Sequence, residues 1–139
     1  MTTASFTGSG TAADPWTLST PPGKSTYQAR RDEASDPPVV VVQVGGTQLR
    51  YHLRAITDLQ EMLAARGDWV ALGNADEQKP APEGSVEAWA RSPDNPVGGW
   101  YGLEKGLRGR FGNYMPPILE ALGLAEVEHN ARNNRMRAL

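Results

Sequence analysis

A β-branched run, two glycines and a second β-favouring run constrain the fold of this chain more than any other feature. The run Val39–Val44 precedes Gly45 and Gly46, and the run Thr47–Leu53 follows them. Valine and threonine favour extended backbone, and a glycine pair supplies the positive φ angles that tight hairpin turns require. The pattern therefore predicts an antiparallel β-hairpin, and two prolines mark its entry.

Helical periodicity, with caps and breakers at its ends, predicts several short helices after the hairpin. Thr57 and Gln60 fit a capping box for a helix that ends at Gly67. We expect Ser85 to cap a second short helix. A pair of prolines just before Ile118 is expected to open a third helix.

The segment 99–114 gives two conflicting signals. Apolar and aromatic residues recur at helical spacing from Trp100 through Leu107 to Tyr114, which favours a helix. The same segment has glycine at positions 99, 102, 106, 109 and 112. Each glycine inside a helix costs about 1 kcal/mol relative to alanine. Either the segment is a helix that packs very closely on its neighbours, or it is not a regular helix.

Together these signals predict one α+β domain over residues 14–139, preceded by a flexible arm at 1–13. A chain of 139 residues favours a single domain with a modest core. An antiparallel sheet, with short strands near Trp16 and Tyr27 and the hairpin, would pack against three or four short helices. The runs 124–130 and 135–139, joined by a polar turn, predict a closing C-terminal hairpin.

The sequence predicts no catalytic residue, no cofactor and no metal site. It has no cysteine, which excludes disulfides, thiolate zinc sites and a cysteine nucleophile. Its two histidines, His52 and His129, cannot form a three-histidine metal site. Glu77 and Lys79 have the spacing of a nuclease motif, but the prolines that follow favour an exposed loop.

Basic, aromatic and glycine residues gather near the C-terminus, although the formal net charge is −2. From Gly99 onward the chain has six Lys and Arg and four Asp and Glu. The part before Gly99 has eight Lys and Arg and twelve Asp and Glu. This concentration predicts a non-enzymatic interaction module with an unknown protein partner. Glycines beside cations can also expose N–H groups to a phosphate, or simply allow close packing. The candidate binding residues here are Trp100, Tyr101, Lys105, Arg108 and Arg110.

The C-terminal string LEALGLAEVEHNARNNRMRAL has the order apolar helix, Leu-Gly-Leu, strand, basic turn and strand. It resembles the end of winged-helix domains of bacterial regulators. The resemblance implies a nucleic-acid partner, with Arg132, Arg135 and Arg137 contacting phosphates. The string departs from the pattern, since two prolines interrupt the expected recognition helix and Glu126 and Glu128 would repel phosphate. The alternative is a terminal hairpin that closes the core, with solvated arginines.

Four longer strings, DPWTLSTPPG, GDWVALGNADEQKPA, EAWARSPDNPVGGWYGL and LGLAEVEHNARNNRMRA, extend over most of the chain. They resemble a family of small uncharacterised proteins of high-GC Gram-positive bacteria, the actinobacteria. The resemblance covers Asp14 to Ala138 and implies a bacterial protein with a single intact domain. It implies no activity and no site residues.

The chain is expected to be cytoplasmic and not to enter a membrane. Its N-terminal string MTTASFTGSGTAADPW lacks the basic and apolar regions of a secretory signal. No apolar run approaches the roughly 20 residues needed to span a bilayer.

Overall fold

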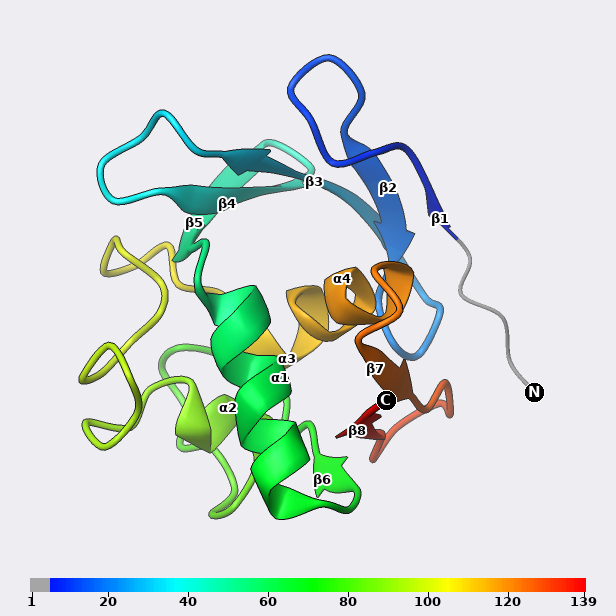
Figure 1. Cartoon of the computed structure of the whole chain (residues 1–139), viewed down its shortest axis with the longest axis vertical. Helices are drawn as coiled ribbons and strands as arrows, with labels where there is room; N and C mark the ends of the chain where they lie inside the picture. The colour runs from blue at the N-terminus through cyan, green and yellow to red at the C-terminus, as the bar shows by residue number, and fades with distance from the viewer. Residues whose placement is uncertain (1–5) are drawn as a thin grey trace.

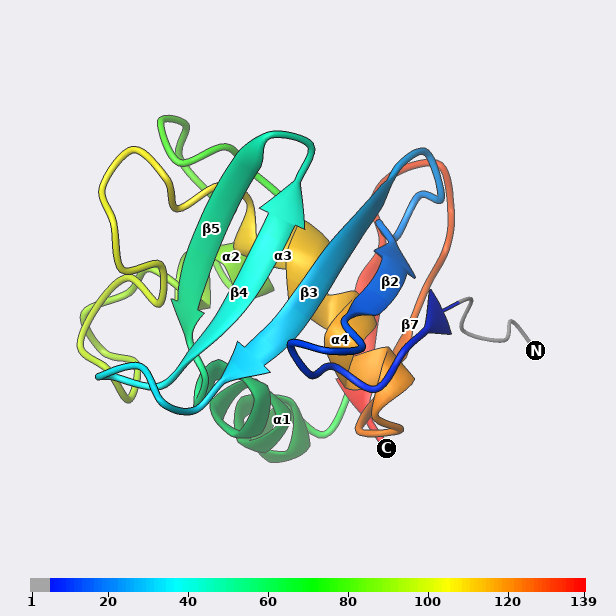
Figure 2. The same cartoon turned by 90° about the horizontal axis from the view of Figure 1, so that it is seen from above.

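A curved antiparallel sheet forms one layer of the protein, and the helices lie against its inner face (Figure 1). The computed structural model of the chain describes residues 6–139. Within these residues the strands of this five-stranded sheet follow one another in sequence order, and Figure 2 shows α1, α3 and α4 beneath them. The strands are β1 Phe6–Thr7, β2 Trp16–Ser19, β3 Thr26–Asp32, β4 Val39–Val44 and β5 Thr47–His52.

A second, three-stranded sheet lies beside the helices, in the order β6-β8-β7. Its central strand β8 contacts α1, and β7 contacts α4. The helices are α1 Ala55–Arg66, α2 Val86–Trp89, α3 Phe111–Tyr114 and α4 Pro116–Ala121, and the strands are β6 Val70–Ala71, β7 Ala125–Val127 and β8 Arg135–Ala138.

The core fills the space between the large sheet and the helices. Val40 and Val42 of β4 are fully buried, as are Leu59 and Leu63 of α1 and Ile118 of α4. Each such side chain contributes about 1.5–3 kcal/mol through removal of its apolar surface from water. Sheet and helices share this one core, so the predicted α+β fold is confirmed.

Both predicted hairpins are confirmed. Strands β4 and β5 pair from Val39 opposite His52 to Val44 opposite Thr47, and Gly45 in the turn has a φ of 57°. Strands β7 and β8 also pair antiparallel. The short strand β6 adds to the other edge of β8, an association that the sequence did not predict.

The predicted capping box of the first helix is wrong, although its end is confirmed. Helix α1 begins at Ala55, and the Thr57 hydroxyl donates to the carbonyl of Arg54 at 3.1 Å. Ala55 and Ile56 are buried, so packing against the core extends the helix upstream of the polar signal. Gly67, with a φ of 68°, terminates it as predicted.

The glycine-rich segment is irregular from residue 99 to 110, and only Phe111–Tyr114 forms the short helix α3. Gly106 and Gly109 have φ angles of 90° and 58°, which residues other than glycine rarely adopt. The segment lies along the edge of β5, where the N–H of Leu103 donates to the carbonyl of Arg50 at 3.0 Å. Glycine thus serves both for turning and for close approach.

The arm predicted over residues 1–13 is described only in part. Residues 1–5 lie outside the described residues. Residues 6 and 7 form β1, in which Phe6 pairs with Leu18 of β2.

Replacing Gly109 with alanine is expected to destabilise the protein by about 1–3 kcal/mol, because a Cβ would add both strain and overlap. That Cβ would lie 2.6 Å from Cδ1 of Leu49 and 3.3 Å from the Tyr51 hydroxyl. Urea unfolding measures the effect. Gly46→Ala is the control, because a Cβ there meets nothing within 4 Å, and it should change stability by less than about 0.5 kcal/mol. Equal effects of the two variants would contradict this account of the segment.

Candidate functional site

The adjacent aromatic residues of the predicted binding face point in different directions. Tyr101 is fully buried, and its hydroxyl donates to Oδ2 of Asp58 at 2.9 Å. Burial, together with this hydrogen bond and the charge of Asp58, raises the pKa of Tyr101. The prediction that Tyr101 belongs to an exposed binding face is therefore wrong, since this side chain anchors the loop to α1.

Trp100 is half-buried and contacts two arginines. The guanidinium carbons of Arg91 and Arg108 lie 4.5 Å and 4.7 Å from the centroid of its ring. Nε of Arg108 also donates to the carbonyl of Gly102 at 3.1 Å. Two guanidinium groups at this distance are in cation–π contact with the ring, so part of its π surface is already used within the chain. The structure therefore brings Trp100 and Arg108 together, but as an internal contact.

The backbone N–H groups predicted to face a phosphate are occupied by a carboxylate of the same chain. Glu77 accepts from the N–H of Gly106 at 2.7 Å and from the N–H of Arg108 at 2.8 Å. Arg110 is exposed and lies 3.9 Å from Asp76, whereas Lys105 is exposed without a charged partner within residues 6–139. Acidic residues of the 74–84 loop thus offset the basic 102–110 segment.

Two arginines of the terminal hairpin are also paired internally. Arg135 forms a two-point contact with Glu128, with Nε–Oε1 and Nη2–Oε2 distances of 2.9 Å and 2.8 Å. This hydrogen-bonded arginine lowers the pKa of Glu128. Arg137 pairs with Glu126 at 2.8 Å. Both guanidinium groups lie over the Trp69 ring, at 5.1 Å and 4.5 Å from its centroid.

The helix that precedes the hairpin does not present a recognition face. α4 has six residues, and Pro116, Pro117, Ile118 and Leu119 among them are buried. Its more accessible side includes Glu120, whose charge would repel phosphate. The geometry of α4 and of the paired arginines gives no support to the winged-helix interpretation.

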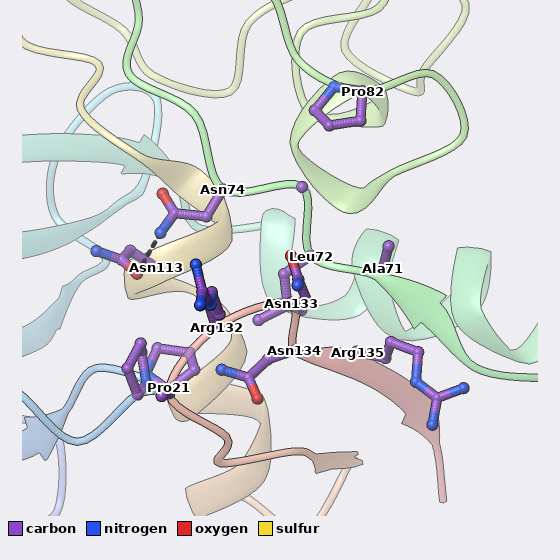
Figure 3. A pocket seen from close by; sticks show the side chains of 13 residues that line it. Pro21, Ala71, Leu72, Asn74, Pro82, Asn113, Arg132, Asn133, Asn134 and Arg135 are labelled. Atoms are coloured by element: carbon purple, nitrogen blue, oxygen red, sulfur yellow. Dashed lines mark hydrogen bonds between the residues drawn. The ribbon is translucent and has the colours of Figure 1, made fainter.

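Arg132 lies on the wall of a cavity of about 490 Å³ (Figure 3). Ligand pockets commonly measure roughly 300–1,000 Å³. Arg132 is exposed, and its side chain has no ion pair or hydrogen bond within residues 6–139. The cavity lies where five stretches of the chain meet, and its lining residues are Pro21, Pro22, Ala71, Leu72, Gly73, Asn74, Pro82, Asn113, Ala131, Arg132, Asn133, Asn134 and Arg135.

Two carboxamides face each other across this cavity wall, where Nδ2 of Asn74 donates to Oδ1 of Asn113 at 2.9 Å (Figure 3). A buried carboxylate positions both. Glu87 is 1% exposed and accepts from the N–H groups of Ala75 at 3.4 Å and of Gly112 at 3.0 Å, which neighbour the two asparagines in sequence. Desolvation raises the pKa of Glu87, and these two hydrogen bonds lower it only in part.

A histidine connects two walls of the cavity. Nδ1 of His129 lies 2.9 Å from the carbonyl oxygen of Pro21, and Nε2 lies 2.6 Å from Oε2 of Glu120. Both partners are acceptors, so the contact is complete when both ring nitrogens are protonated. Desolvation lowers the pKa of His129, but the hydrogen bonds to Glu120 and Pro21 outweigh it and raise the pKa.

Comparison with known proteins decides the family. The sequence model of the Family of unknown function (DUF6855) matches residues 8–139. The chain belongs to this family. The predicted relation to proteins without an assigned function is confirmed, while the expected bacterial origin stays a prediction. Neither a curated protein nor a solved structure matches the chain. Family membership assigns no role to any residue, so the chemistry of the site follows from its geometry.

Two further observations concern residues 6–139. None of their helices has the length and apolar character needed to cross a bilayer. Nor do three or more His, Cys, Asp or Glu side chains of this range gather where they could hold a metal ion.

The sequence singled out Arg132 and Arg135 but not the other residues that line the cavity. Asn74, Asn113 and Pro21 come from three segments that are far apart in the chain. Asparagines and prolines are frequent in loops, and nothing in their local spacing marks these three. Only the tertiary contacts bring them to one cavity.

Replacing Glu77 with alanine is expected to free the 102–110 segment. Charge-assisted hydrogen bonds contribute about 1.5–3 kcal/mol, so hydrogen exchange at the amides of Gly106 and Arg108 should accelerate at least about tenfold. Amide exchange followed by NMR measures this. Glu83→Ala, in the same loop, is the control and should leave both rates unchanged. Unchanged rates in the Glu77 variant would mean that other contacts hold the segment.

The two histidines predict opposite effects of pH on stability. A raised folded pKa means that the contribution of His129 is complete below about pH 6.5 and is lost as pH rises through the folded pKa. Desolvation and Arg54 lower the pKa of His52, so its contribution is lost as pH falls below about 6.5. In urea unfolding from pH 5.5 to 8.5, His129→Gln should remove the decline at high pH. His52→Gln should instead leave that decline in place. If His52→Gln removed the decline of stability at high pH and His129→Gln left it in place, the proposed role of the His129 contact would be wrong.

Proposed function

We propose that this protein is a non-enzymatic binding module that takes an anionic ligand into the cavity at Arg132. The supporting observation is the state of this arginine, which is unpaired while Arg135 and Arg137 are each paired with a glutamate. No aspartate or glutamate is among the cavity's lining residues within the described chain. An unpaired guanidinium in such a setting attracts anions and offers two parallel donors to a carboxylate or phosphate.

The composition of the cavity supports binding rather than catalysis. Its lining side chains are amides, arginines, prolines and aliphatic groups. Such side chains do not exchange protons near neutral pH, so they provide no general acid or base. Ser85 follows the lining residue Pro82 by three positions. Its hydroxyl donates to the carbonyl of Pro82 and accepts from the N–H of Ala88, so it serves as the cap of α2.

The proposal keeps the predicted interaction module but places its binding surface at Arg132 rather than at Trp100 and Arg108, which contact each other. We further propose that the protein acts in the cytoplasm of a high-GC Gram-positive bacterium. The resemblance of its sequence strings to that group of proteins supports the source. The cytoplasmic compartment stays a prediction.

Titrations of the ¹⁵N-labelled protein with citrate, orthophosphate and neutral glycerol test the proposal. Citrate or orthophosphate should shift the amide resonances of residues 131–134 in a saturable way, and glycerol should not. Arg132→Gln should weaken anion binding at least about tenfold, because it removes the positive charge. The matched control is Arg50→Gln, an exposed arginine on β5, which should bind as the original protein does.

Two outcomes would contradict the proposal. One is anion binding that is equal in the Arg132 and Arg50 variants. The other is a salt-sensitive affinity for mixed-sequence oligonucleotides that disappears in an Arg135→Gln, Arg137→Gln double variant. The second outcome would favour the nucleic-acid interpretation of the terminal hairpin, since phosphate contacts depend steeply on salt.

A further inference from the structure

The cavity combines one unpaired cation with a pair of amides and apolar walls. This combination suits a carboxylate that directly follows a peptide bond. Building on the anion site proposed above, we propose that the cavity binds the free carboxyl terminus of a partner polypeptide.

The charge of the cavity favours a single carboxylate. Arg132 is unpaired within the described residues. Arg135 instead donates to Glu128 from Nε to Oε1 at 2.9 Å and from Nη2 to Oε2 at 2.8 Å. The cavity therefore offers one positive charge to a ligand. A phosphate monoester has a charge of about −1.5 to −2 at neutral pH, which one arginine compensates only in part. A carboxylate has a charge of −1, and its planar oxygens match the guanidinium fork.

The asparagine pair offers complementary groups to a peptide unit. The hydrogen bond from Nδ2 of Asn74 to Oδ1 of Asn113 leaves Oδ1 of Asn74 free to accept and Nδ2 of Asn113 free to donate. A peptide unit has one N–H and one C=O, so it can pair with both. Arg132, Asn74 and Asn113 all line this cavity (Figure 3), so one ligand in it can meet both the guanidinium and the amides.

The remaining walls favour a polypeptide over a nucleotide. Pro21, Pro22, Pro82 and Leu72 give apolar surfaces for the side chains of a bound segment. No tryptophan, tyrosine or phenylalanine is among the described lining residues, so a nucleobase has no ring on which to stack.

The turn that presents Arg132 is already ordered. Oδ1 of Asn134 accepts from the N–H of Asn130 at 2.6 Å, and its Nδ2 donates to the carbonyl of Asn130 at 2.9 Å. The N–H of Leu72 donates to the carbonyl of Asn134 at 2.9 Å, which ties the turn to the opposite wall. A preformed site loses less conformational entropy when it binds its ligand.

Two peptide pools test the inference on the full chain. Both contain N-acetylated tripeptides of mixed sequence, one with free carboxylates and the other with C-terminal amides. We expect the free-acid pool to bind at least about tenfold more tightly. It should shift the side-chain NH₂ resonances of Asn74 and Asn113. Arg132→Gln should abolish the difference between the pools, Asn113→Ala should weaken the free-acid pool, and Arg50→Gln should change neither. Amide spectra of each variant establish that its fold is retained.

The outcomes separate this inference from the proposed function. If citrate binds at Arg132 but the two pools bind equally or not at all, the carboxyl-terminus assignment is wrong and the anion site stands. If citrate, orthophosphate and the free-acid pool all fail to bind, both proposals are wrong. A free-acid preference that persists in Arg132→Gln would also overturn the inference, because the carboxylate would then bind elsewhere.

Discussion

The buried carboxylate of Glu87 is the contact on which the geometry of the candidate site depends. It accepts hydrogen bonds from the N–H groups of Ala75 and Gly112, and it lies 3.5 Å from the guanidinium of Arg91. Arg91 in turn donates to the carbonyls of Lys79 and Ala75. A charge removed from water in this way persists only when its hydrogen bonds are satisfied. The need to satisfy it fixes the 74–80 loop, α2 and the start of α3 relative to one another.

A second constraint is the internal use of arginine. The arginines at 108, 135 and 137 stack on tryptophan rings, and those at 135 and 137 are also paired with glutamates of β7 or its end. These contacts shield the aliphatic parts of the arginine side chains and the faces of the tryptophan rings from water. The basic surplus of the C-terminal segment is thus largely structural, and Arg132 differs from these arginines because its charge is not matched by a neighbour.

Two sets of contacts position the walls of the candidate site, one centred on Glu87 and the other on His129. Glu87 holds Asn74 and Asn113 on one side, whereas the contact of His129 with Pro21 and Glu120 connects the turn before β3 to the terminal hairpin. Glu87 and His129 both bond to backbone groups of the chain rather than to a ligand in the cavity. Two walls of the cavity are therefore positioned by groups that do not line it, which is typical of binding sites with a preformed shape.

Local signals in the sequence determined the two hairpins, the end of α1 at Gly67 and the irregular loop at 74–84, because turn glycines and prolines act over a few residues. The sequence left open whether 99–114 is helical, and it misplaced the start of α1. Burial decided both, because close packing on β5 and on the core outweighs intrinsic propensity. The cavity was not predictable at all. Its walls come from segments more than 100 residues apart, such as Pro21 and Arg132, and only the tertiary structure decides which charges remain unpaired there.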